Sequence, residues 1–259
     1  VSGAALMPGV LVFHLGDPTR GRVEPKATQL HGMVSTLLAE TDFEHRSDHK
    51  PWSAAVTRES RERLEVRLGW LDVRPPEGRV TAAVRLGPGT YPVLAQHWRP
   101  VTFDQLAAHP CDEVGLEFLT PTWFSRSGQS LPFPTPALTF ARLVDRWNQH
   151  CEPAQVIPRS LRSALLDSLT LTAWSGETGR MDFGRGVRTG FVGRVVAALD
   201  AADPAAGAAA PGNAAQGNRD AAQMAELLPS VLGALAGFAE LSGVGAQTTY
   251  GAGRVQVVR

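Results

Sequence analysis

The hydrophobic positions in the second half of the chain alternate between the periods of strands and helices. Apolar residues at helical spacing, such as Phe140, Val144 and Trp147, predict a helix with one buried face. The predicted elements are a strand at 113–122, a helix at 136–150, strands at 167–174 and 186–199, a helix beginning near Pro229 and a strand at 254–258. This β-α-β-β-α-β order is that of a ferredoxin-like unit.

The first half of the chain shows the same rhythm. Its predicted elements are a strand at 9–16, a helix at 26–40, strands at 51–58 and 63–72, a short helix at 79–87 and a strand at 90–98. We therefore expect an α+β protein of two tandem ferredoxin-like (βαββαβ) domains, at 1–110 and 111–259. One mixed sheet with added elements is the alternative.

Residues 200–223 interrupt the second unit with Ala, Gly, Pro and Asn. The segment has too little apolar bulk to build a core, so we expect a flexible insertion.

Composition restricts the class of protein. The chain is 43% hydrophobic, which is enough to build a core. No apolar run has the length of a membrane span, and the start lacks the pattern of a signal peptide. Cys111 and Cys151 are the only cysteines, which argues neither for a disulfide framework nor for a cysteine metal cluster. We expect a cytoplasmic protein without a membrane partner, a metal or a cofactor.

The charge pattern alone does not identify a partner. Formal net charge is zero, so no overall positive field indicates nucleic-acid binding. Among the 25 basic residues only Lys26 and Lys50 are lysines. Codon usage in a GC-rich genome explains this bias, and so does a need for forked phosphate contacts.

Residues 241–254 place four glycines between the last helix and the last strand. A dinucleotide fingerprint would follow a strand and open a helix, and no Gly-Lys-Ser/Thr of a Walker loop occurs. Two interpretations remain open: a turn whose N–H groups face an anionic backbone, or a plain connection.

Four stretches in the same order resemble one family. They are LHGMVSTLLAETDFEHRSDHKPWSAAV (30–56), LEFLTPTWF with PFPTPALTFARLVDRWNQ (116–124 and 132–149), GFVGRVV (190–196) and FAELSGVGAQTTYGAGRV (238–255). Together they are similar to the CRISPR-associated endoribonucleases that cut precursor CRISPR RNA, the sixth Cas family of the RAMP superfamily.

The resemblance implies two ferredoxin-like domains and metal-independent cleavage of CRISPR repeat RNA to mature crRNA. In that family the 2′-hydroxyl attacks the adjacent phosphate, which leaves a 2′,3′-cyclic phosphate and a 5′-hydroxyl. No cofactor is implied, and the partner is repeat RNA. The alternative is a non-catalytic crRNA-binding RAMP subunit, whose partners would include other Cas proteins of an effector complex. A small-molecule-binding ferredoxin-like protein has only the fold in its favour.

The cleavage chemistry needs an acid, a base and a positive group near the phosphate. The catalytic candidates are His45, His49 and Lys50, from the loop FEHRSDHKPWS. The family often carries a histidine ahead of a Lys-Pro-aromatic-Ser/Thr stretch, which residues 50–53 match, and His45 is the closer positional match. A solvated polar loop is the alternative. A structural role is expected for the other histidines, which are His14, His31, His97, His109 and His150. We expect no tyrosine partner in the first helix.

Arginines and the glycine-rich loop are the candidate RNA contacts. Arg188 and Arg194, six apart in a strand, are expected to share one face, although a solvated strand face explains them as well. The loop lacks the lysines or arginines often seen there in the family. The full set of expected RNA-binding residues is Arg46, Arg180, Arg185, Arg188, Arg194, Gly243, Gly245, Gln247, Thr248, Thr249, Gly251, Gly253 and Arg254. We expect the loop to lie over the cleft between the two domains.

Overall fold

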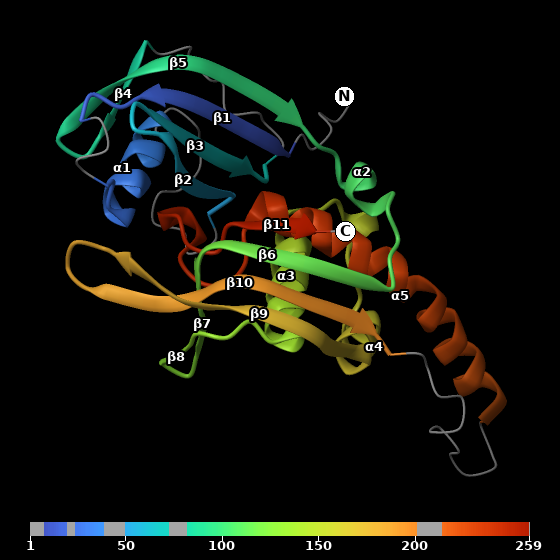
Figure 1. Ribbon diagram of the computed structural model, residues 1–259. Helices are drawn as coiled ribbons and strands as arrows, with labels where there is room; N and C mark the ends of the chain where they lie inside the picture. Colours follow the sequence, from blue (N-terminus) through green and yellow to red (C-terminus); the bar gives the residue numbers. More distant parts are fainter. Residues whose placement is uncertain (1–7, 20–23, 39–49, 73–81, 201–213, 259) are drawn as a thin grey trace, which may run out of the picture.

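The first half of the chain forms an antiparallel sheet of five strands in the order β2-β3-β1-β5-β4 (Figure 1). The computed structural model describes residues 8–19, 24–38, 50–72, 82–200 and 214–258, with side chains described in the last range from residue 222 onward. The elements are β1 (Gly9–Gly16), α1 (Ala27–Leu37), β2 (Trp52–Ser60), β3 (Arg63–Trp70), β4 (Ala83–Leu86) and β5 (Gly89–Pro100).

Strand alternation builds the core of this unit. Leu11, Phe13 and Leu15 project from the same face of β1 and are buried. Leu30 and Val34 of α1 are four residues apart, so they share one helical face and pack into the same core. The opposite face of the sheet turns toward the second half of the chain, where Val10 joins the other core.

The second half contains a four-stranded sheet in the order β11-β6-β10-β9. Its core combines Phe118 of the sheet with Phe140 and Val144 of α3 and with Leu235 and Phe238 of α5. The elements from the end of the first unit onward are α2 (Phe103–Ala107), β6 (Glu113–Thr122), β7 (Phe124–Arg126), β8 (Gln129–Leu131), α3 (Pro136–His150), α4 (Arg159–Ser168), β9 (Leu169–Asp182), β10 (Val187–Leu199), α5 (Ala214–Ser242) and β11 (Val255–Val258).

The strand order of both units is that of the ferredoxin-like fold. In each sheet the first strand lies between the third and the last, as β5-β1-β3-β2 and as β11-β6-β10-β9. The prediction of two tandem ferredoxin-like units is confirmed, and the alternative of one mixed sheet is wrong.

The short helix expected at 79–87 is not formed in its described part. Ala83–Leu86 is instead strand β4, which pairs with β5 so that Val84 lies opposite Tyr91. Leu86-Gly87-Pro88-Gly89 makes the turn, and Gly87 has a φ of 62°. A glycine at positive φ between alternating residues is a hairpin signal, and it overrides the weak helical spacing.

Helix α5 begins well before Pro229, where the sequence suggested its start. It runs from Ala214 with Pro229 in its interior. The preceding residues include Met224, Leu227 and Leu228, which are good helix formers, and Leu228 is buried in the core. Their packing outweighs the one helical hydrogen bond that the proline removes.

The expected insertion at 200–223 is only partly described. Residues 201–213 lie outside the described residues, and 214–223 belong to α5, so they are not part of an irregular segment. The sequence was expected to contain no apolar run of membrane-span length, but Ala222–Ser242 is long and apolar enough to cross a membrane by length and composition. Half of this stretch, 50%, is buried. Leu232, Leu235 and Phe238 are fully buried, so this stretch serves as the core helix of the second unit.

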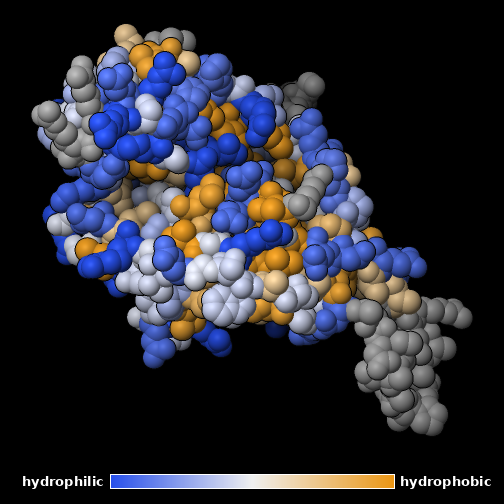
Figure 2. Space-filling model, viewed as in Figure 1, coloured by the Kyte–Doolittle hydropathy of each residue, from blue (hydrophilic) through white to orange (hydrophobic). Residues whose placement is uncertain are grey.

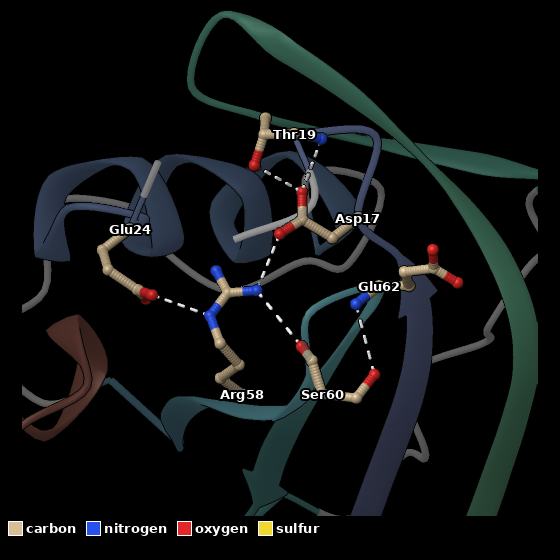
Figure 3. Close-up of polar contacts among 6 residues, drawn as sticks. All are labelled: Asp17, Thr19, Glu24, Arg58, Ser60 and Glu62. Atoms are coloured by element: carbon tan, nitrogen blue, oxygen red, sulfur yellow. Dashed lines mark hydrogen bonds and ion pairs between the residues drawn. The ribbon is translucent and has the colours of Figure 1, made fainter. Parts of the chain in front are cut away.

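A polar network fixes the connection from β1 to α1 (Figure 3). The buried Asp17 accepts hydrogen bonds from the backbone N–H of Thr19 at 2.8 Å and from Nη1 of Arg58 at 2.7 Å. Arg58 also donates from Nε to Glu24 Oε1 at 2.7 Å. One arginine of β2 therefore ties the end of β1 to the residues just before α1.

The two units meet along the end of α5. The hydroxyl of Ser53 in β2 donates to the carbonyl oxygen of Leu241 at 2.7 Å. A Cβ on Gly69 of β3 would lie 1.8 Å from the same oxygen, so only glycine allows this approach. On the face drawn in Figure 2, polar side chains cover much of the first unit, and apolar ones are interspersed among polar ones near the junction.

Candidate functional site

The glycine-rich loop, residues 243–254, is a fixed turn. Gly243, Gly245, Gly251 and Gly253 all have positive φ. A Cβ on Gly253 would lie 1.8 Å from the carbonyl oxygen of Val244, whose own N–H donates to Gly253 O at 2.8 Å. The loop therefore closes on itself, and its glycines are required by backbone geometry.

The loop bridges the two units, as the sequence predicted. Arg254 donates from Nη2 to Glu65 Oε1 of β3 at 3.1 Å and from Nη1 to the hydroxyl of Thr57 in β2. Its backbone N–H donates to Thr120 Oγ1 of β6 at 2.9 Å. The guanidinium of Arg254 is thus engaged by the first unit.

His31 of α1 lies at the centre of a cluster beside the loop. Its Nδ1 is 3.1 Å from the carbonyl oxygen of Thr249, and its Nε2 is 3.1 Å from Nζ of Lys50. Its ring stacks on Tyr250 with centroids 3.9 Å apart and planes 3° apart, and on Trp52 at 5.2 Å. Because the carbonyl only accepts, Nδ1 carries the proton, and Nε2 accepts from the Lys50 ammonium.

Arg146 of α3 links the cluster to the second unit. It donates from Nη1 to Thr248 Oγ1 at 3.0 Å, and from Nη2 to the carbonyl oxygens of Trp52 at 2.9 Å and Lys50 at 3.3 Å. Desolvation by the surrounding protein lowers the pKa of Arg146 to about 10, so the guanidinium stays charged at neutral pH. Its Nε is sealed from solvent and has no hydrogen-bond partner among the described residues.

Two hollows border the glycine-rich loop. The first, about 310 Å³, lies against α3 and is lined by Lys50, Arg142, Arg146 and residues 243–246. The second, about 540 Å³, is lined by Gln247 and Tyr250 and by parts of α1, the β7–β8 turn and the β9–β10 hairpin. Ser125 and Ala246 border both, so the hollows adjoin. A larger cavity of about 790 Å³ lies on the other side of the junction.

The predicted arginines are distributed over the long β9–β10 hairpin. All four are exposed, and Arg185 and Arg188 line the second hollow. Arg194 instead lies in the middle of the sheet, with its guanidinium beside Gly115 of β6. Arg180 is on β9, opposite Thr189. The structure thus brings Arg185 and Arg188 together with Gln247, and it places Arg194 elsewhere.

Of the histidine loop, residues 43–53, the structure describes only residues 50–53. His45, Arg46 and His49 lie outside the described residues, whereas Lys50 is described and belongs to the His31 cluster. Within the described ranges no group of three His, Cys, Asp or Glu side chains is placed to hold a metal ion.

Sequence reasoning missed His31, Arg146 and Tyr250 as site residues. His31 was expected to have only a structural role, but its ring contacts Thr249 and Tyr250 of the loop. No local pattern connects it to Thr249, which is 218 residues away. All three lie in stretches that resemble the family, but only Trp52 of this cluster, besides Lys50, matched a named position of a family motif, as the aromatic residue of the Lys-Pro-aromatic stretch.

Comparisons with known proteins place this geometry in a family. A family model for the CRISPR-associated endoribonuclease Cas6 matches residues 116–255, which is more than half of the chain. No match was found among curated proteins.

Solved structures agree over the whole length. A Cas6 product complex is 26% identical with a TM-score of 0.77, and the match covers 98% of this chain and 100% of that chain. Cas6 of Thermus thermophilus is 24% identical with a TM-score of 0.71, covering 99% and 100%. A Cas6-related protein of Pyrococcus furiosus shares only 10% identity, with a TM-score of 0.61 and coverage of 97% and 99%. These last two matches are under 25% identical and speak for the fold alone. The chain therefore belongs to the Cas6 family of CRISPR-associated endoribonucleases.

Proposed function

We propose that this chain cleaves CRISPR repeat RNA in the precursor transcript without a metal ion, by attack of a 2′-hydroxyl on the adjacent phosphate. The products are a 2′,3′-cyclic phosphate and a 5′-hydroxyl. The observation that carries the proposal is the contact between His31 and Lys50 beside the glycine-rich loop. A matched structure is a product complex of a Cas6, which supports RNA as the substrate.

The orientation of His31 suits proton transfer. The Thr249 carbonyl holds the proton on Nδ1, which leaves Nε2 as the basic nitrogen. The His31 ring stacks on both Tyr250 and Trp52, and these contacts prevent it from turning away from the loop. When Lys50 moves to a phosphate oxygen, Nε2 becomes free to accept the proton of the 2′-hydroxyl.

Two proton transfers are needed, and His31 supplies one of them in this proposal. His45, the closer family match, supplies the other, and His49 is the second choice for the same role. The Lys50 ammonium neutralises charge that develops on the phosphate oxygens, a role that a metal ion has in other nucleases.

RNA is bound across both sides of the glycine-rich loop in this proposal. Arg185 and Arg188 border the second hollow together with Gln247 and Tyr250. Exposed arginines give forked contacts to phosphate, and an aromatic ring offers a stacking surface for a base.

Single-turnover cleavage of labelled repeat RNA in EDTA tests the proposal. We expect His31→Ala, His45→Ala and Lys50→Ala each to slow cleavage by roughly 10²–10⁴-fold, the usual value of a positioned proton transfer or charge. His109→Ala is the matched control, because this exposed histidine lies on the other side of the junction and should cut at the wild-type rate.

The ends of the products test the chemistry. We expect a 2′,3′-cyclic phosphate on the upstream fragment. The downstream fragment should carry a 5′-hydroxyl, which a polynucleotide kinase can phosphorylate. Cleavage that requires added Mg²⁺ would contradict metal independence. Retention of the RNA without cleavage would instead identify a crRNA-binding subunit.

A further inference from the structure

We propose that the hollow between α3 and the glycine-rich loop binds a second phosphodiester of the RNA, next to the one that is cut. The hollow is about 310 Å³, at the small end of ligand sites, so it suits a phosphate with part of a ribose better than a paired stem. This inference rests on the proposed function.

Positive charge dominates the walls of this hollow. Arg142 and Arg146 are four residues apart on α3, so both project toward it from one helical face, and Lys50 closes the opposite side. One carboxylate, Asp145, also borders it. Asp145 pairs with Arg162 of α4 at 3.3 Å, so its charge is already compensated.

The two α3 arginines contact neutral oxygens. Arg142 donates to the carbonyl oxygen of Ser125 at 3.1 Å. Arg146 donates to carbonyl and hydroxyl oxygens, and neither arginine contacts a carboxylate in the described structure. Cations held among neutral acceptors favour an oxyanion as a further partner.

The position of the hollow relates it to the cleavage site. Lys50 borders the hollow, but His31, which contacts the Lys50 ammonium, does not. A phosphate in the hollow would therefore sit on the α3 side of Lys50, and the reacting group on the α1 side. The second hollow adjoins through Ser125 and Ala246, so one RNA strand can pass along the loop from Arg188 to Arg142. Such a contact would fix which phosphate meets His31.

Arg142 is the residue to test, because it is exposed and its loss should leave the fold intact. We expect Arg142→Gln to weaken binding of repeat RNA roughly tenfold, and to reduce the magnitude of the log–log salt slope by about 0.7. Arg142→Lys should keep the slope while losing part of the affinity, because the charge remains and the fork is lost. Arg159→Gln is the matched control: it removes one exposed arginine of α4 that lines neither hollow, so affinity and slope should stay unchanged.

Inorganic phosphate tests whether the anion in the hollow is a phosphodiester of RNA or a free phosphate ion. If free phosphate raises the melting temperature of the wild type but not of Arg142→Gln, while both bind RNA equally, the hollow is a free-anion site and the proposal is wrong. If the wild type cleaves RNA and Arg142→Gln still shows the wild-type salt slope of RNA binding, the proposal is also wrong. If the wild type binds RNA without cutting it, the proposed function fails, but the slope still decides this subsite.

Discussion

Replacement of Gly253 by alanine isolates the steric requirement of the glycine-rich loop. Gly253 has a φ of 70°, and an added Cβ would lie 1.8 Å from the carbonyl oxygen of Val244. Gly128, in the β7–β8 turn, has a φ of 78° with nothing within 4 Å of an added Cβ. The two positions therefore share the backbone penalty and differ in the clash.

The expected magnitudes follow from these distances. A left-handed alanine costs about 1–2 kcal/mol, so Gly128→Ala should destabilise the fold by that amount. Gly253→Ala must also displace a backbone oxygen and break the Val244–Gly253 hydrogen bond, which leaves polar groups unpaired at about 1–3 kcal/mol. We expect a total of about 2–5 kcal/mol for Gly253→Ala.

Urea denaturation of both variants measures the difference, with cleavage rates measured on the protein that remains folded. Equal destabilisation of the two variants would show that the loop relaxes freely and that its closed shape is not imposed by Gly253. Loss of cleavage in Gly253→Ala alone would link the shape to function.

Two further predictions concern the supports of α1. Arg58→Ala should destabilise the fold by about 2–4 kcal/mol in urea denaturation, because it removes an ion pair of the buried Asp17 carboxylate; a cost under 1 kcal/mol would mean that the network is a solvated surface cluster. Asp182 accepts a hydrogen bond from the Gly184 N–H at 2.6 Å and pairs with Lys26 at 3.4 Å, and these contacts lower the pKa of its carboxyl below 3.8. A carboxyl group whose pKa is lower in the folded than in the unfolded state stabilises the fold at pH values above its unfolded pKa. This stabilisation is lost as the pH falls through the folded pKa. The difference in unfolding free energy between wild type and Asp182→Asn should therefore be constant above about pH 5 and shrink below 3.8; a difference that grows on acidification would contradict this.

Most of the fold follows from local patterns. The strands at 9–16, 113–122 and 186–199 and the helix at 136–150 were each predicted within a residue of their observed bounds. These segments have clear periods of 2 or 3.6 residues, because one face of each packs on a core. Where the period was weak, as at 79–87, a glycine turn decided the outcome instead.

The site was only partly predictable for the opposite reason. Gly243, Gly253 and Lys50 have signals along the chain, as a glycine cluster and as a family stretch. His31 and Arg146 acquire their surroundings from the docking of two units, through contacts 94 to 218 residues apart in sequence. Periodicity within one element carries no information about such contacts.

The contacts of Arg146 show why the site needs both units. One guanidinium from α3 contacts the backbone of Lys50 and Trp52 in the first unit and the hydroxyl of Thr248 in the loop. Separation of the units would expose this cation to water and would also part His31 from Thr249 and Tyr250 of the loop. The packing of the two units against each other therefore also positions the proposed catalytic groups. An anion bound beside Arg146 strengthens the same contact, because it offsets the desolvation that lowers the pKa of this arginine. RNA binding and the closure of the site are thus expected to favour one another.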